Sequence, residues 1–137
     1  MIVIASLKRS PSKLSSFQEK IFEVENNIGV AVSGLTADGT SMIDFIRGEI
    51  KKHTFLYDTT IEGGRLVNLV ARKTQVSKYF CSEILRNVYM KVSTQRSSHR
   101  PYGVGVVIGA AGKIGANLYY VCPSGNVYEH NAVAIGV

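Results

Sequence analysis

The stretch from Gly103 to Cys122, GVGVVIGAAGKIGANLYYVC, decides between two folds. An apolar, β-branched run leads into glycines at 109, 112 and 115, which is typical of the first turn of a dinucleotide-binding fold. Such a site requires a helix directly after the glycines, because the pyrophosphate binds the free amides at the start of that helix.

The residues that follow Gly115 favour a strand over a helix. Residues 116–122, ANLYYVC, are rich in β-branched and aromatic side chains, and a proline comes next. Glu129 is the only acid beyond Gly115, and it lies in a strand pattern rather than at a ribose-binding position. We therefore predict strands over 103–108 and 116–122 joined by a turn over 109–115. Backbone geometry, with φ > 0 at one or more glycines, is then the role of the glycines.

A second hairpin is predicted near the start of the chain. Residues 20–25, KIFEVE, alternate charged and apolar side chains, and residues 28–35, IGVAVSGL, form a run of small and apolar ones. Asn26 and Asn27 between them are a turn signal. Two strands joined by so short a turn form a β-hairpin.

Between the hairpins, the apolar residues recur with a helical period. The spacing predicts one helix over 36–53, with Thr36 or Asp38 capping its first amides. A second helix is predicted from 64 to about 93, which is long enough to be broken into two pieces near Ser77.

Apolar runs predict two more strands, over 2–7 and 127–137. The order is then strands, two helices, strands. Segregated runs of this kind argue for an α+β fold with a mainly antiparallel sheet, because parallel sheets need strands and helices to alternate.

Composition excludes several classes of function. The net charge is +6, but the basic residues are spread out and no nucleic-acid motif accompanies them. No apolar run approaches the roughly 20 residues that span a membrane. The potential metal ligands Cys81, Cys122, His53, His99 and His130 are scattered without ligand spacing. We expect no nucleic acid, membrane, metal or cofactor, and residence in the cytosol or nucleus.

Three stretches together resemble the α-type subunits of the 20S proteasome. They are LKRSPSKLSSFQEKIFEVENNIGVAVSGLTADG at 7–39, RPYGVGVVI at 100–108 and LYYVCPSGNVYEHNAVAIG at 118–136. The resemblance covers nearly all of residues 2–136. Its most specific residues, expected to serve the structure of the subunit, are Gly34, Asp38, Arg100, Pro101 and Gly103.

The resemblance implies the four-layer α-β-β-α sandwich of the N-terminal-nucleophile hydrolases, with mainly antiparallel sheets. Residues 1–137 are expected to form a single, incomplete domain of this kind. From the resemblance, we expect the given residues to lack the N-terminal tail, short helix and first strand of the family, and also its later helices and strands. Roughly 16 residues at 77–92 resemble an insertion, and their amphipathic pattern predicts an extension of the second helix.

The function implied by the resemblance is structural. The α subunits of this family form seven-membered rings that cap the β rings, gate substrate entry and dock activators in ubiquitin-dependent degradation, in both cytoplasm and nucleus. Lys20 and Leu35 match residues of a pocket between neighbouring α subunits. That pocket receives the C-terminal carboxylate of an activator tail, such as a regulatory ATPase subunit. Alternatively, Lys20 is an ordinary surface lysine at a strand end.

Two enzymatic alternatives stay open. Catalytic β subunits of the same superfamily use an N-terminal threonine tuned by an aspartate and a lysine. Lys20 falls where that lysine falls, but Leu7 stands at the place of the aspartate and the chain begins with Met1 and Ile2. We expect no catalytic residues, with a threonine-type peptidase as the first alternative and a dinucleotide-binding oxidoreductase as the second.

Overall fold

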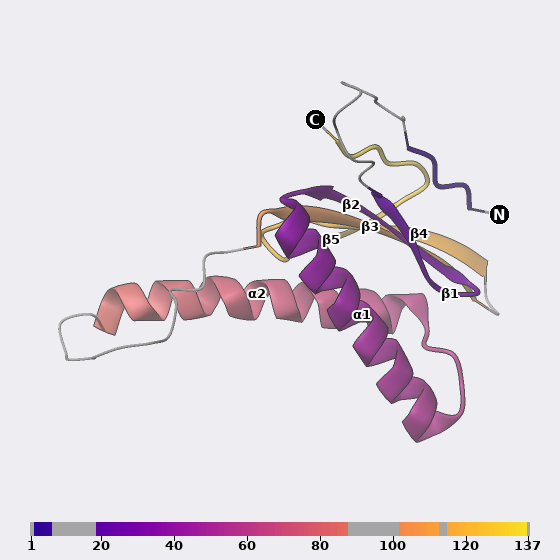
Figure 1. Ribbon diagram of the computed structural model, residues 1–137, viewed down its shortest axis with the longest axis horizontal. Helices are drawn as coiled ribbons and strands as arrows, with labels where there is room; N and C mark the ends of the chain where they lie inside the picture. The colour runs from indigo at the N-terminus through magenta and orange to yellow at the C-terminus, as the bar shows by residue number, and fades with distance from the viewer. Residues whose placement is uncertain (1, 7–18, 88–101, 113–114, 137) are drawn as a thin grey trace.

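A computed structural model of the chain describes residues 2–6, 19–87, 102–112 and 115–136, with side chains in α2 described as far as 75. The elements run in the order strand, strand, helix, helix, strand, strand, strand (Figure 1). They are β1 (Ile21–Glu25), β2 (Ile28–Gly34), α1 (Thr36–Tyr57), α2 (Gly63–Asn87), β3 (Val104–Gly112), β4 (Gly115–Val121) and β5 (Val127–His130).

The five strands form one antiparallel sheet in the order β1-β2-β3-β4-β5. The predicted hairpin of β1 and β2 is confirmed, with a turn at Asn26 and Asn27. β2 pairs with β3 although the two helices separate them in the chain; Ile28 lies opposite Ala110 and Gly34 opposite Val104. The α+β class with an antiparallel sheet is therefore confirmed.

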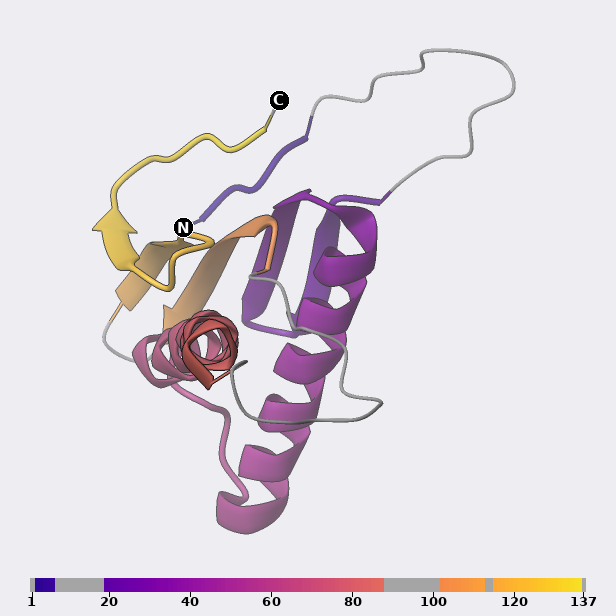
Figure 2. The same cartoon turned by 90° about the vertical axis from the view of Figure 1, so that its left-hand side faces the viewer.

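Both helices cover the same face of the sheet (Figures 1 and 2). The apolar sides of the helices and the inward-facing positions of the strands form one core. Its members include Ile28, Val30, Met42, Ile43, Ile46, Leu66, Val70, Val106, Ile108 and Val121. Burial of these side chains is the main stabilising contribution that the described residues offer.

The other face of the sheet carries residues 2–6 and 133–136, which cross it as extended segments (Figures 1 and 2). Two glycines make room for the first segment. A Cβ atom on Gly109 would lie 2.9 Å from Cγ2 of Ile2, and one on Gly29 would lie 3.2 Å from Cδ1 of Ile4. The small residues of this face thus let a second layer approach closely.

The two segments differ from the strands predicted over 2–7 and 127–137. Residues 2–6 form no strand pairing among the described residues, because they lie over the face of the sheet rather than at its edge; Leu7 lies outside the described residues. The strand predicted over 127–137 ends at His130, beyond which the chain leaves β4 to cross the same face.

The turn predicted over 109–115 is also too long. Pairing of β3 with β4 continues to Gly112 opposite Gly115, so only residues 113 and 114 separate the two strands. Gly115 has φ +150°, which confirms the expected positive φ at one of the three glycines, whereas Gly109 is a buried strand residue beneath Ile2. A strand, not a helix, follows these glycines, so the structure does not favour a dinucleotide site.

Both helices differ from their predictions at the ends. α1 continues to Tyr57, and its N-cap residue is Leu35, which has no side-chain acceptor, rather than Thr36 or Asp38. α2 is continuous through Ser77 to Asn87, so residues 77–87 extend it as predicted for the insertion. Residues 88–92 lie outside the described residues. Neither described helix has the length and apolar character that crossing a membrane requires.

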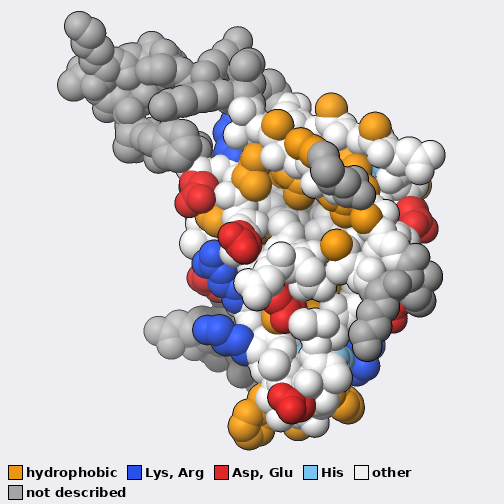
Figure 3. Space-filling model, turned by 90° about the vertical axis from the view of Figure 1, so that its right-hand side faces the viewer, with side chains coloured by type: hydrophobic (Ala, Val, Ile, Leu, Met, Phe, Trp, Pro, Cys, Tyr) orange, Lys and Arg blue, Asp and Glu red, His pale blue; other side chains and the backbone are white. Residues whose placement is uncertain are grey.

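Hydrophobic side chains gather at two places on one side of the molecule (Figure 3). One is the top of this view, where the terminal segments lie, and the other is the bottom, where α1 ends. At that end Phe55, Leu56 and Tyr57 are all exposed, Phe55 to 90%. Tyr57 is held by the His53 ring, 4.8 Å away between centroids, and by the Arg65 guanidinium above it.

Candidate binding pocket beside Lys20

The two residues predicted to line a pocket do lie in one hollow. Its volume is about 190 Å³, and it sits where β1 begins, β2 ends and α1 starts. The lining residues are Glu19, Lys20, Phe22, Val32, Ser33, Gly34, Leu35, Thr36, Gly39 and Thr40. The chain thus brings together side chains from two strands and the first turns of a helix.

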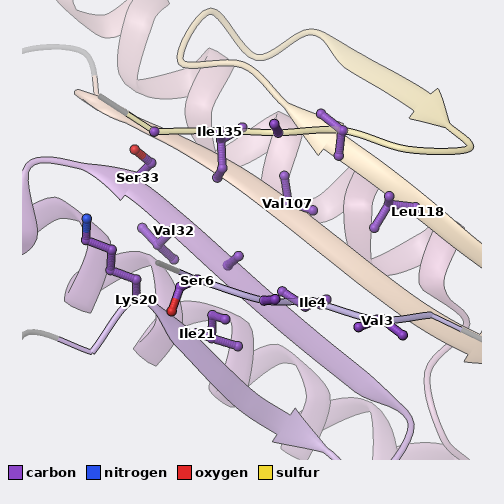
Figure 4. Close-up of a pocket in the computed structure, with 15 residues that line it drawn as sticks. Val3, Ile4, Ser6, Lys20, Ile21, Val32, Ser33, Val107, Leu118 and Ile135 are labelled. Carbon is purple, nitrogen blue, oxygen red and sulfur yellow. The ribbon is translucent and has the colours of Figure 1, made fainter. Parts of the chain in front are cut away.

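Lys20 is positioned by its backbone. Its carbonyl oxygen accepts a hydrogen bond of 2.9 Å from the Val32 amide, which continues the β1–β2 pairing by one residue. Its side chain is exposed and makes no ion pair with any described residue. Figure 4 shows Lys20 with Val32 and Ser33, from the side of a larger cavity of about 510 Å³ on the face of the sheet opposite the helices.

Leu35 supplies an apolar wall that is half exposed, at 49%. Its N–H donates to the Gly103 carbonyl at 3.1 Å, and its own carbonyl accepts from the Gly39 N–H at 3.0 Å. α1 also approaches β2 closely, since a Cβ on Gly39 would lie 3.0 Å from Cγ1 of Val32. These contacts fix the leucine between the end of β2 and the start of α1.

Gly103, in the stretch at 100–108, contacts residues of the stretch at 7–39, which lies far away in the chain. Its N–H donates to Oδ2 of Asp38 at 3.0 Å, and its carbonyl accepts from the Leu35 amide. Gly34 has φ +133°, and a Cβ there would overlap the Gly103 carbonyl oxygen. The structure therefore places Gly34, which lines the pocket, against Asp38 and Gly103. Arg100 and Pro101 lie outside the described residues.

We expect Asp38→Ala to destabilise the fold by about 1–2 kcal/mol, because it removes a hydrogen bond to a charged acceptor. Asp38→Asn keeps an acceptor oxygen and should lose less. Urea unfolding followed by circular dichroism measures both free energies. Equal stability of Asp38→Ala and the unsubstituted chain would show that the Gly103 contact contributes nothing.

Sequence reasoning missed several members of the pocket. Phe22 lies two positions after Lys20, so the alternation of β1 could have placed it on the same side. Ser33 precedes the Gly34-Leu35 motif. The side chain of Glu19 had no such signal, because strand alternation would send it away from Lys20.

The pKa of Tyr120, on β4 and outside the pocket lining, is raised by its hydrogen bond with Cys122 and then by burial. Among the described residues, no group of three or more His, Cys, Asp or Glu is arranged to hold a metal ion. The pocket lining offers one cation, one anion and an apolar wall. Such a lining suits a small ligand that has both a charged and an apolar part.

One antiparallel sheet, covered on one face by two consecutive helices and on the other by extended segments, defines an α+β protein consistent with part of the N-terminal-nucleophile hydrolase sandwich. The family model for proteasome subunits matches residues 1–83 and 78–137. The chain belongs to the proteasome subunit family. The two matches overlap at 78–83, inside α2 and inside the region that resembles an insertion.

The chain is similar to proteasome subunits alpha type-1 from several organisms. It is 40% identical to the protein of Dictyostelium discoideum, over 98% of this chain and 48% of that protein. It is 34% identical to the protein of Trypanosoma brucei rhodesiense, over 99% and 46%, and 31% identical to that of Drosophila melanogaster, over 98% and 42%. The chain thus spans about half the length of these relatives. The similarity supports an α-type subunit of the 20S proteasome.

Proposed function

We propose that this chain acts as a non-catalytic, structural α subunit of the 20S proteasome core, in an outer seven-membered ring beside other α subunits and above the β subunits. Ubiquitin-dependent degradation in the cytoplasm and nucleus is the process it would serve. Similarity to α type-1 subunits over almost the whole chain supports this proposal. The exposed Phe55, Leu56 and Tyr57 are the kind of apolar surface that subunits bury on assembly.

Assembly is tested by native gels or sedimentation of the chain from its own cells. We expect it to migrate with a particle far larger than the 14.9 kDa chain. The particle should also contain other α and β subunits. Recovery of the chain only as a free monomer would contradict the proposal.

The pocket beside Lys20 is proposed to receive the C-terminal tail of an activator or regulatory ATPase. The observation that carries this proposal is the presence of Lys20 and Leu35 in one hollow. A lysine ammonium suits a terminal carboxylate, and the N-terminal end of α1 adds the positive end of a helix dipole. A volume of about 190 Å³ is below the ~300 Å³ of small cofactor sites, so it fits one or two residues of a tail.

We expect Lys20→Ala to weaken binding of a tail peptide that ends in hydrophobic-Tyr-X by at least about tenfold, because a charge-assisted contact is lost. Lys20→Arg keeps the charge and should retain most of the affinity. Fluorescence anisotropy with a labelled peptide measures both. Unchanged affinity in Lys20→Ala would assign Lys20 to the alternative of a plain surface lysine.

We also propose that the chain does not cleave peptides. By resemblance, Leu7 occupies the place of the catalytic aspartate, so Lys20 lacks the acid with which it would tune a nucleophile. Turnover of fluorogenic peptides by the purified chain, abolished by Lys20→Ala, would restore the threonine-type peptidase as the better hypothesis.

A further inference from the structure

The helix α2 continues past one end of the sheet. Near residue 75 it passes the turn between β4 and β5, where Nε2 of Gln75 donates to the Gly125 carbonyl oxygen at 3.1 Å. A Cβ on Gly125 would overlap Cγ of Gln75, so helix and turn are in close contact there. Residues 76–87, called the arm below, carry the helix about 18 Å further, at about 1.5 Å per residue. Figure 1 shows this part of α2 extending beyond the sheet.

The arm projects from the same end of the sheet that carries the pocket beside Lys20. At this end Val121 of β4 lies opposite Val106 near the start of β3, and Val104 lies opposite Gly34 at the end of β2. Gly34 itself lines the pocket. From β2 to β4 there are two strand spacings, which amount to about 10 Å across the sheet. The arm is therefore longer than the distance that separates its base from the strand at the pocket.

We propose that the arm is a second contact for the activator whose tail enters the pocket beside Lys20. The inference rests on the proposed tail-binding function. A tail whose terminal carboxylate is held at Lys20 leaves the subunit at this end of the sheet, and extended chain advances about 3.3 Å per residue. The length of the arm matches roughly five such residues. The arm therefore reaches past the bound end of the tail to the folded part of the protein that carries it.

The sequence of the arm indicates the kind of surface that it binds. Residues 77–92 repeat apolar residues at helical spacing, and an amphipathic helix binds a partner by laying its apolar face into an apolar groove. The expected partner surface is an apolar groove beside the base of the activator tail. Because residues 77–92 resemble an insertion, this contact would be additional to the tail contact that the resemblance implies.

The proposal is tested by removing the arm from the chain in assembled core particles. Deletion of residues 77–92 should leave the affinity for a labelled peptide ending in hydrophobic-Tyr-X unchanged within about twofold, because the peptide is too short to reach the arm. The affinity for the regulatory ATPase complex that carries such a tail should fall by about tenfold or more, because two linked contacts become one. Fluorescence anisotropy measures the first affinity, and sedimentation of particle with complex measures the second.

A point substitution gives the same test without shortening the chain. Ser82→Pro should weaken binding of the regulatory complex as the deletion does, because proline disrupts the interior of a helix. Ser82→Ala is the matched control, because alanine keeps the helix, and it should bind the complex as the unsubstituted chain does.

Photo-crosslinking locates the contact directly. A photo-reactive amino acid at position 82, irradiated with the regulatory complex bound, should form an adduct with the subunit that carries the tail. The same amino acid at Phe55 should form none with that subunit, because Phe55 lies roughly 28 Å along α1 from the end that lines the pocket.

The outcomes separate the arm contact from the function on which it rests. Equal affinity of the regulatory complex with and without residues 77–92, or an adduct at position 82 only with a neighbouring α subunit, would overturn the arm contact and leave the tail pocket in place. Peptide binding that Lys20→Ala leaves unchanged would overturn the tail pocket, whatever the arm contacts.

Discussion

Gly34→Ala is expected to destabilise the chain by about 3–5 kcal/mol, combining backbone strain with overpacking. The strain arises because Gly34 has φ +133°, which residues with a Cβ rarely adopt. The overpacking arises because the new methyl group would overlap the carbonyl oxygen of Gly103. Backbone cannot rotate away as a flexible side chain can, and moving Gly103 would break its hydrogen bonds with Leu35 and Asp38.

Urea unfolding followed by circular dichroism measures this effect, and Gly48→Ala is its matched control. Gly48 lies within α1 and a Cβ there would meet nothing within 4 Å. Since alanine is the better helix former, Gly48→Ala should stabilise the chain by up to about 1 kcal/mol. A Gly34→Ala variant within about 1 kcal/mol of the unsubstituted chain would contradict the steric argument.

Ile108→Ala is expected to cost about 4 kcal/mol, from lost burial and from the cavity left behind. Ile108 lies in the middle of β3 with 0% of its surface exposed, in the core between sheet and helices. Its neighbours along the core side of the strand, Val106 and Ala110, are buried too, so they cannot turn in from solvent to fill the space.

The control for the core substitution is Val3→Ala, at a side chain that is 73% exposed. It should change the free energy of unfolding by less than about 0.5 kcal/mol, as surface substitutions do. Ile108→Val, which removes one methylene, should cost about 0.5–1.5 kcal/mol. A loss below about 1.5 kcal/mol for Ile108→Ala would mean that the core collapses around the deletion.

The sequence predicts elements well where a local pattern decides them. The strand predicted from KIFEVE is confirmed at Ile21–Glu25, although burial along it does not alternate strictly. The helical spacing of Met42, Ile43 and Ile46 is confirmed by their burial in α1. Tertiary contacts decided the rest. Residues 2–6 have the composition of a strand, but no local signal says whether they pair at an edge or cross the face above Gly109.

Capping illustrates the same limit. Asp38 has the type and position of a helix cap, yet its carboxylate accepts the N–H of Gly103, 65 positions further along the chain. In the pocket, Lys20 and Leu35 were predicted from a resemblance, whereas Glu19 could be added only from the fold, because strand alternation alone puts it on the wrong side.

The single long connection in the sheet has a consequence for how the chain folds. β1–β2 and β3–β4–β5 are local hairpins, whereas β2 must find β3 across the 70 positions from Gly34 to Val104. Contacts so distant in sequence slow folding, so we expect joining of the two hairpin groups to limit its rate. Lengthening this connection by the residues at 77–92 adds only about 0.2 kcal/mol of closure entropy. The extension of α2 therefore falls in the part of the chain where added length disturbs the fold least.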